Sequence, residues 1–310
     1  MNKAVIQVRE FRKVYGDVVA VDGISFDVEE GEIFGLLGPN GAGKTSTLES
    51  LEGLRVPDGG SLQVMGVDPA RQSRQLRDVI GVQLQTSGLP DSIRVDEAMR
   101  FFCAYHGVAP RYDLLDRFGL TEKRDAQYYQ LSAGQKRRLA LALAVAHDPP
   151  VLLLDEPTAG LDVPSRVALH DMLRELQAAG TTIMLATHDM AEAEEMADRV
   201  AILLHGSIVA TGTPLALTAT GAGLTKVSVR TTGSSLPDSG SIFPAVSQHA
   251  FKDGYAIYFS SDIGPTVSAI IAHIEAHDDT LIDLRVERPS LEDRFLEITR
   301  GQGASRGGAA

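Results

Sequence analysis

The sequence of 310 residues predicts an α/β domain built on a mainly parallel sheet, followed by a small α+β domain. Three features of the chain predict this organisation. Short runs that are entirely apolar alternate with longer helical patterns over residues 1–220. Strands that are apolar on both faces belong to covered sheets, which are mainly parallel. After about Thr211, apolar and polar residues alternate instead, as they do in strands with one exposed face.

The apolar runs give the expected elements of the first domain in order. Strands are expected at 34–37, 151–154, 183–186 and 200–204, and a helix is expected at 44–53 behind a glycine-rich turn. The chain between 67 and 130 is mostly helical in pattern, with an amphipathic helix expected over 93–106. We therefore expect a helical subdomain at about 86–147 within a domain that spans 1–220.

The C-terminal part is expected to begin after a linker. Gly212, Pro214 and the small residues at 219–223 are typical of such a connection. Alternating runs at 226–232, 255–261 and 281–289 predict strands, and helices are expected at 266–277 and at 290–300, the latter capped by its opening serine. We expect an α+β domain over 225–300 and a disordered tail over 301–310.

Composition excludes several classes of protein. The chain carries 41 Asp and Glu against 29 Lys and Arg, a formal net charge of −12, which is unlike the basic footprint of a nucleic-acid-binding protein. The single cysteine, Cys103, excludes an intrachain disulfide and a multi-cysteine metal site. Charges at 9–13 stand where a signal peptide needs an apolar core, and no apolar run approaches the ~20 residues that span a bilayer. We expect a soluble, cytoplasmic protein that reaches a membrane only through a partner.

A glycine-rich stretch between the first of these strands and its helix carries the strongest motif. Residues 38–45 read GPNGAGKT and match G-x-x-x-x-G-K-[ST], in a context that disfavours a chance glycine turn. Glycines let such a loop wrap tightly around phosphate oxygens, and the following helix aims its positive dipole end at the same charge. Lys44 is expected to reach the β- and γ-phosphates and Thr45 to ligate Mg²⁺. The expected nucleotide-binding residues here are Gly38, Pro39, Asn40, Gly41, Ala42, Gly43, Lys44, Thr45 and Ser46.

Two adjacent carboxylates follow the apolar run at 151–154. Burying such a pair is costly unless a cation accompanies it. Asp155 at the end of the strand is placed to hold Mg²⁺, and Glu156 is placed to polarise the water that attacks the γ-phosphate. An acidic pair after a strand is a weak signal by itself. Together with the phosphate loop it supplies the second half of one ATP-hydrolysing site.

A third motif, LSAGQ at 131–135, narrows the class of ATPase. With it the sequence resembles the ABC transporter ATPase family, whose signature is usually LSGGQ. The resemblance implies a P-loop NTPase core with an antiparallel N-terminal β subdomain, and it implies that Ser132, Gly134 and Gln135 contact ATP bound to a second subunit. Ala133 replaces the usual glycine and adds a methyl group near the phosphate. An ordinary capped helix would explain Ser132 alone.

The same resemblance assigns four further positions. Tyr15 matches the aromatic residue that stacks on adenine, and Gln85 matches the catalytic glutamine that contacts Mg²⁺ and the lytic water; Gln83 is the less favoured candidate for that role. Asp162 should shape the contact between two subunits. His188 matches the catalytic histidine that contacts the γ-phosphate, although an isolated histidine after a strand usually has no such role.

The resemblance also implies partners and a direction of transport. The expected partners are a second copy of the chain and a separate membrane permease, whose coupling helix would reach the lobe around 86–106, at the inner face of the cell membrane. The stretch RPSLEDRFLEIT at 288–299 resembles the tail of drug- and antibiotic-efflux ATPases of the daunorubicin-resistance type, which favours export of a drug-like, antibiotic or lipid-like substrate. ATP and Mg²⁺ are the expected cofactors.

Three alternatives remain in view. A non-transport ABC ATPase acting in DNA repair, chromosome structure or translation would carry a long coiled-coil insertion, zinc cysteines or two fused cores, and none of these is present. A silent nucleotide-binding regulator is disfavoured because Lys44, Asp155, Glu156 and His188 are all retained. An importer ATPase is the third alternative, and only the C-terminal stretch weighs against it.

Overall fold

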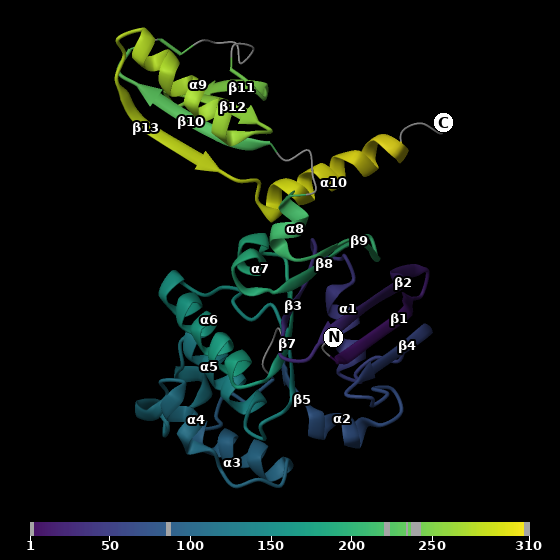
Figure 1. Ribbon diagram of the computed structural model, residues 1–310. Helices are drawn as coiled ribbons and strands as arrows, with labels where there is room; N and C mark the ends of the chain where they lie inside the picture. Colours follow the sequence, from purple (N-terminus) through teal and green to yellow (C-terminus); the bar gives the residue numbers. More distant parts are fainter. Residues whose placement is uncertain (1–2, 85–87, 220–223, 234, 237–242, 307–310) are drawn as a thin grey trace. The chain divides into compact units, whose positions relative to one another are not determined.

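The computed structural model describes residues 3–84, 88–219, 224–233, 235–236 and 243–306 (Figure 1). The chain forms two compact units, Met1–Pro214 and Leu215–Ala310. Within the described residues, no helix is both long enough and apolar enough to cross a membrane.

A six-stranded sheet forms the centre of the first unit. Its strands, in the order β5-β6-β7-β3-β8-β9, are Ile80–Gln83, Val151–Asp155, Thr182–Thr187, Ile33–Leu37, Arg199–Leu204 and Ser207–Gly212. All neighbouring pairs are parallel except β8 and β9. Every residue of β3, β6 and β7 is buried, because helices cover both faces of the sheet. The predicted α/β fold with a mainly parallel sheet is confirmed.

A separate antiparallel sheet forms the N-terminal part of this unit. Its order is β2-β1-β4, with β1 at Ala4–Tyr15, β2 at Val18–Glu29 and β4 at Gly59–Val64. Apolar residues on its inner face join the core of the central sheet, and Phe26 of β2 stacks on Phe34 of β3 with ring centroids 5.3 Å apart. The expected antiparallel subdomain is therefore present.

Helices account for most of the remainder of the first unit. They are α1 (Lys44–Leu51), α2 (Ser73–Val79), α3 (Val95–Tyr105), α4 (Tyr112–Arg117), α5 (Ala133–Ala144), α6 (Val163–Ala178) and α7 (Met190–Met196), with 3₁₀ turns at Thr121–Lys123 and Tyr128–Gln130. The amphipathic helix expected at 93–106 is α3, which buries Val95, Ala98, Met99 and Cys103. Cys103 is a buried apolar residue of this face.

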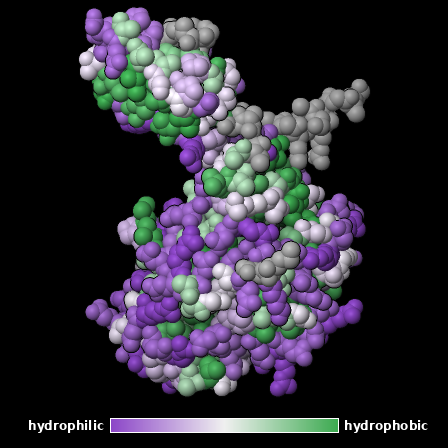
Figure 2. All heavy atoms as spheres, viewed as in Figure 1, coloured by the Kyte–Doolittle hydropathy of each residue, from purple (hydrophilic) through white to green (hydrophobic). Residues whose placement is uncertain are grey.

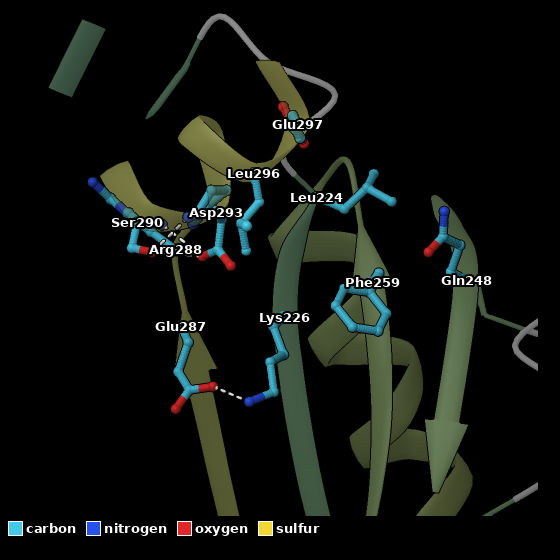
Figure 3. Close-up of a pocket in the computed structure, with 11 residues that line it drawn as sticks. Leu224, Lys226, Gln248, Phe259, Glu287, Arg288, Ser290, Asp293, Leu296 and Glu297 are labelled. Carbon is cyan, nitrogen blue, oxygen red and sulfur yellow. Dashed lines mark hydrogen bonds and ion pairs between the residues drawn. The ribbon is translucent and has the colours of Figure 1, made fainter. Parts of the chain in front are cut away.

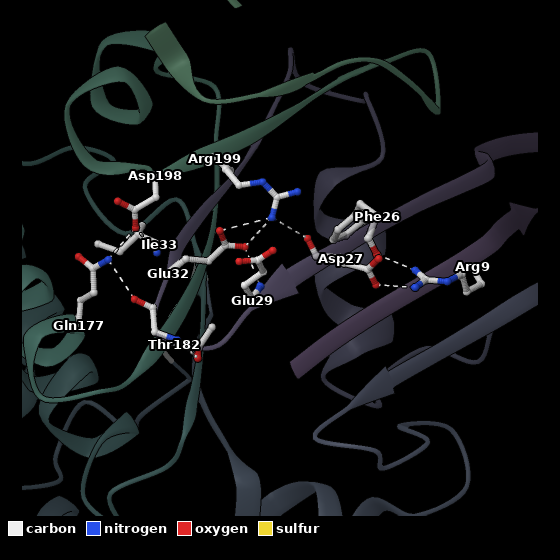
Figure 4. Close-up of polar contacts among 11 residues, drawn as sticks. Arg9, Phe26, Asp27, Glu29, Glu32, Ile33, Gln177, Thr182, Asp198 and Arg199 are labelled. Atoms are coloured by element: carbon white, nitrogen blue, oxygen red, sulfur yellow. Dashed lines mark hydrogen bonds and ion pairs between the residues drawn. The ribbon is translucent and has the colours of Figure 1, made fainter. Parts of the chain in front are cut away.

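A polar network joins the central sheet to the antiparallel sheet (Figure 4). Arg199 on β8 donates to the buried carboxylate of Glu32 at 3.0 Å and to the carbonyl oxygen of Asp27 on β2 at 3.4 Å. Glu32 also accepts from the backbone N–H of Glu29 at 2.7 Å. Burial raises the pKa of Glu32, and the backbone hydrogen bond and the Arg199 charge oppose that rise. The ion pair thus connects the two sheets at a partly desolvated position.

The second unit is an antiparallel sheet with helices beside it. The strands, in the order β11-β12-β10-β13, are Val246–Lys252, Tyr255–Ser260, Thr225–Thr231 and Leu281–Glu287. The helices are α8 (Pro214–Ala219), α9 (Ile263–Ala276) and α10 (Leu291–Arg306). Residues from β10, β12 and α9 form its core, namely Val227, Val229, Tyr258 and Ile270. Figure 3 shows the opposite side of the sheet, where Lys226 of β10 pairs with Glu287 of β13.

Three features of the second unit differ from expectation. β11 and α8 were not predicted, and α8 begins at Pro214, inside the expected linker. The last helix continues past Arg300 to Arg306, into the stretch expected to be disordered. Proline fits the first turn of a helix, where its missing N–H has no intrahelical partner, which explains why Pro214 can begin α8.

Glu52, at the end of α1, is a buried carboxyl group that the sequence did not reveal. Only 9% of the residue is exposed, and among the described residues neither carboxylate oxygen has a hydrogen-bond partner. Burial raises the pKa of Glu52 to about 8, and the nearby charges of Asp155 and Glu49 add to the rise. At neutral pH this side chain is therefore mainly a neutral acid behind the phosphate loop.

Replacing Arg199 by alanine should lower the free energy of unfolding by about 2 kcal/mol, because Glu32 would remain buried without its cationic partner. Urea denaturation of the full chain measures this. Arg71→Ala is the matched control, since Arg71 is mostly exposed beside Asp68 and should change stability by less than about 0.5 kcal/mol. Equal effects of the two substitutions would contradict the role given to the Arg199 pair.

Glu52→Gln should make stability less dependent on pH. The folded-state pKa of about 8 lies above the ordinary value of 4.5, so the folded chain holds a proton that the unfolded chain has lost between these values. The stability of the wild-type protein should fall as pH rises from 4.5 to 8, by on the order of 3 kcal/mol from this residue. Denaturation at pH 5.5 and pH 8 should show a smaller loss in the variant. The exposed control Glu122→Gln should keep the wild-type dependence.

Candidate functional site

The phosphate loop at 38–43 connects β3 to α1, as the motif predicted. Two of its glycines are required by space and by conformation. Gly38 has φ +155° and a Cβ there would stand 2.3 Å from the carbonyl oxygen of Leu203; Gly43 has φ +106° and its Cβ would stand 2.5 Å from that of Ala20. Any side chain at either position would displace backbone. The loop therefore keeps the tight curve that turns successive N–H groups toward one point.

Lys44 lies inside this loop. Only 5% of the surface of Lys44 is exposed. Its ammonium group donates to the carbonyl oxygens of Gly38 at 2.8 Å and Pro39 at 3.2 Å. Burial lowers the pKa of Lys44, while Glu156 and Asp155 oppose that effect. Pro39, Asn40 and Gly41 form an exposed rim. A buried cation held by the loop carbonyls, with two carboxylates near enough to affect its pKa, is suited to bind the terminal phosphates of a nucleotide.

Thr45 and Asp155, the two residues predicted to ligate Mg²⁺, lie in direct contact. The Thr45 hydroxyl donates to Asp155 Oδ2 at 3.0 Å, although the two residues stand on different elements. Asp155 Oδ1 is buried and has no hydrogen-bond partner among the described residues. Burial raises the pKa of Asp155, and the Glu156 charge adds to this, so that a bound cation would stabilise its ionised form. Hydroxyl and carboxylate oxygens with one unsatisfied position fit Mg²⁺.

Glu156 and His188 meet at the ends of β6 and β7. His188 Nδ1 lies 2.8 Å from Glu156 Oε1, and the Glu156 N–H donates to the carbonyl oxygen of Ala186 at 2.9 Å. Glu156 has φ +47°, a left-handed conformation that is strained for a residue with a side chain. The side chain of His188 is half exposed. The strained backbone aims a carboxylate along the same edge as Lys44, where a general base is needed.

The signature residues cap α5. Ser132 accepts from the Gln135 N–H at 3.2 Å, and Gln135 Oε1 accepts from the Ser132 N–H at 2.9 Å. Ser132 and Ala133 are exposed, so the methyl group of Ala133 meets no packing constraint within one chain. Gly134 is buried, and a Cβ there would stand 2.7 Å from Ser165 Oγ. Within the described chain, these signature residues make no hydrogen bond to the phosphate loop.

Asp162 caps the next helix beside this signature. Its carboxylate accepts from the Ser165 N–H at 2.9 Å, and hydrogen bonds from Ser165 lower the pKa of Asp162. Ser165 also makes the close approach to Gly134, so the beginnings of α5 and α6 lie side by side. Sequence reasoning missed Ser165, because a serine three residues after a helix cap carries no distinctive signal.

The remaining predicted positions lie apart from these contacts or outside the described residues. The exposed ring of Tyr15 lies at the end of β1, with Lys13 Nζ 5.3 Å and the Arg55 guanidinium 5.9 Å from its centroid. Gln85 lies outside the described residues. Gln83, which the sequence disfavoured, ends β5 as a buried side chain whose amide has no hydrogen-bond partner among the described residues.

A buried polar cluster supports the segment after Glu156. The Thr158 hydroxyl donates to Glu192 Oε1 on α7 at 2.7 Å, and His170 Nε2 of α6 lies 3.5 Å from the same oxygen. These three residues join the segment after β6 to the two helices beside it. Sequence reasoning missed them because their sequence separation is large and each fits an ordinary helix or loop.

The model of the ABC transporter family matches residues 21–159. The Nod factor export ATP-binding protein I of Ralstonia nicotianae is 36% identical over 304 residues, covering 95% of this chain and 94% of that protein. The protein of the same name from Rhizobium sp. (strain N33) is 44% identical over 223 residues, covering 70% of this chain and 73% of its own length.

Solved structures resemble the first unit. An ATP-binding subunit of an ABC transporter has 28% identity and a TM-score of 0.64, over 69% of this chain and 91% of that one. The structure of cbiO1 from Clostridium perfringens, part of the ABC transporter complex cbiONQ, has 30% identity and a TM-score of 0.63, over 71% and 92%. With the buried lysine, the Thr45–Asp155 pair and the Glu156–His188 pair at one sheet edge, these matches identify the chain as a member of the ABC transporter family, an ATP-binding subunit that hydrolyses ATP with Mg²⁺.

Proposed function

We propose that this chain powers an exporter, with a separate membrane permease as the channel for its substrate. The main support for this proposal is the arrangement of five side chains at the carboxyl ends of three neighbouring parallel strands. They are Lys44, the Thr45–Asp155 pair and the Glu156–His188 pair. That edge is where open α/β sheets bind ligands. The relatives named for Nod factor export support the direction of transport.

Each side chain has a role that follows from its position. Lys44 binds the terminal phosphates from within the loop, while Tyr15 offers its exposed ring to the adenine. Thr45 and Asp155 would hold Mg²⁺, which when bound neutralises phosphate charge. Glu156 orients the attacking water and accepts its proton, and His188 holds that carboxylate while its exposed edge faces the γ-phosphate. Gln85 remains a candidate for contact with the metal and the water.

The signature residues supply the second half of the proposed site in a dimer. Ser132 is exposed at the positive end of α5, and it makes no hydrogen bond to the loop of its own chain in the described residues. A second copy, turned by a two-fold axis, would place this helix end against the γ-phosphate. Asp162 and Ser165 fix the helix end laterally, through the close approach at Gly134. Two such copies would enclose two molecules of ATP.

The permease contact is proposed on the helical segment. Phe101 and Tyr105 of α3 expose 64% and 56% of their surface. Tyr105 also lines a neighbouring hollow of about 260 Å³, together with Phe102, His147 and the buried Glu52. An exposed aromatic surface beside a hollow fits a short amphipathic helix. Docking there would bring the chain to the inner face of the membrane, with a drug-like, antibiotic or lipid-like substrate carried by the permease.

Replacing Lys44 by alanine should reduce steady-state ATP hydrolysis by about 100-fold or more, because the phosphates lose their buried cation. Release of inorganic phosphate by the purified chain measures the rate. Lys3→Ala, at an exposed lysine far along the chain from the loop, should keep the wild-type rate. An unchanged rate in Lys44→Ala would place hydrolysis elsewhere.

Glu156→Gln should bind ATP without hydrolysing it and should accumulate the closed dimer. The amide keeps the size of the side chain but cannot accept the proton of the water. Size-exclusion chromatography with saturating ATP and Mg²⁺ should show the dimer, at a protein concentration where the nucleotide-free chain is monomeric. Adding Ser132→Arg to Glu156→Gln should prevent it by blocking the signature end of α5. If Glu156→Gln stays monomeric under these conditions, the proposal that two copies enclose the ATP is wrong.

A further inference from the structure

The β13 strand leaves one edge of the C-terminal sheet open. It pairs with β10 on one side, and within the described residues no strand pairs with its other side. Its residues are exposed or half-exposed throughout. Two of its apolar residues are well exposed, Ile282 at 50% and Val286 at 42%. Figure 2 shows apolar surface on the C-terminal unit. Open edges with apolar side chains are sites where another strand can add.

The sequence of β13 is complementary to itself. The strand reads LIDLRVE at 281–287. If two copies pair antiparallel about Leu284, Asp283 of each copy stands directly opposite Arg285 of the other, and Ile282 stands opposite Val286. A two-fold axis creates each of these pairs twice. Opposite charges and matched apolar residues in directly opposed positions stabilise a strand pair.

The two neighbouring odd-numbered centres and the other edge of the sheet lack this match. Pairing about Asp283 would oppose two aspartates, and pairing about Arg285 would oppose two arginines, both of which are destabilising. The far edge strand, β11, reads VSQHAFK and carries no acidic residue to oppose Lys252. Pairing about Val286 would oppose Arg285 and Glu287, but it would align only residues 285–287 of the strand, whereas pairing about Leu284 aligns all of 281–287. Charge complementarity along the whole strand therefore favours β13 in the register about Leu284.

The charged side chains of Asp283 and Arg285 are oriented by hydrogen bonds on one face of the sheet. Arg285 Nε donates to Asp283 Oδ2 at 2.8 Å, and the Tyr255 hydroxyl donates to the same oxygen at 2.7 Å. These hydrogen bonds lower the pKa of Asp283, so it is ionised at neutral pH. Arg285 remains more than half exposed and can bind a second carboxylate. On the same face, Lys226 pairs with Glu287 and orients that end of the strand (Figure 3).

We propose that two copies of this chain associate through their C-terminal sheets, β13 against β13 about Leu284, independently of nucleotide. The four-stranded sheets would join into one sheet of twice the width, with Ile282 and Val286 covering each other. Asp283 and Arg285 of the two copies would form a cluster of four alternating charges. This contact is distinct from the ATP-enclosing one, and it would keep two cassettes together between hydrolytic cycles.

Sedimentation velocity of the nucleotide-free full chain in EDTA tests the proposal over a range of concentrations. The wild-type chain should form dimers as concentration rises. Asp283→Arg sets like charges opposite each other twice, and so does Arg285→Asp, so each should raise the dimer dissociation constant at least about tenfold. Lys252→Glu, a charge reversal on the other edge, should leave dimerisation unchanged. Circular dichroism confirms that each variant is folded.

A mixing experiment with the two single variants gives the most specific test of the register. In a mixed pair every position again opposes unlike charges, so an equimolar mixture of Asp283→Arg and Arg285→Asp should recover the dimer, as should the double variant alone. A wild-type chain that stays monomeric, a single variant that dimerises normally, or a mixture that stays monomeric would each overturn the proposal. None of these outcomes bears on ATP hydrolysis, so the Lys44 experiment stands separately. The Glu156→Gln experiment is separate as well, because it is run at a concentration where the nucleotide-free chain is monomeric.

Discussion

Lys44 is a buried cation that interacts electrostatically with two nearby carboxylates, and the organisation of the first unit keeps these three charges close to one another. Lys44 comes from the beginning of α1, and Asp155 and Glu156 come from the end of β6. A parallel sheet brings the carboxyl ends of its strands to one edge, even where a helix stands between them in the sequence. Each charge alone would be costly to bury, whereas together, and with two loop carbonyls, they compensate one another.

The balance of charge at this edge also favours the ligand. Asp155, Glu156 and, when ionised, Glu52 outnumber the one lysine. Burial raises the pKa values of Asp155 and Glu52, and neighbouring carboxylates add to the rise. A divalent cation bound with an anionic nucleotide would relieve the repulsion between carboxylates and occupy the orphaned oxygen of Asp155. The acidic net charge of the chain is thus compatible with an anionic ligand, because the ligand arrives with its counter-charge.

Much of the fold and site could be predicted because the relevant signals are local. An apolar run of five residues must be covered on both faces, and the glycines at 38 and 43 stand where any side chain would strike backbone. Glu156 and His188 were each assigned to the site, but their direct contact was not predicted, because the adjacency of β6 and β7 is set by the sheet order. Glu52, Ser165 and the Thr158–Glu192 contact were not predicted either, because burial of a polar residue depends on segments distant in the sequence. β11 was missed for a related reason, since its alternation is mostly polar and its place is set by β12.

The left-handed backbone at Glu156 has an evolutionary consequence. A residue with a side chain in that conformation costs the folded state about 1–3 kcal/mol, and glycine or asparagine would relieve much of the strain. Selection for stability alone would therefore drift away from glutamate at this position. If Glu156 has the catalytic role that we propose, its presence there reflects a selective pressure for chemistry that outweighs the pressure for a relaxed chain. A descendant released from the need to hydrolyse ATP would be expected to lose this residue before it lost the glycines of the loop, whose replacement the fold itself forbids.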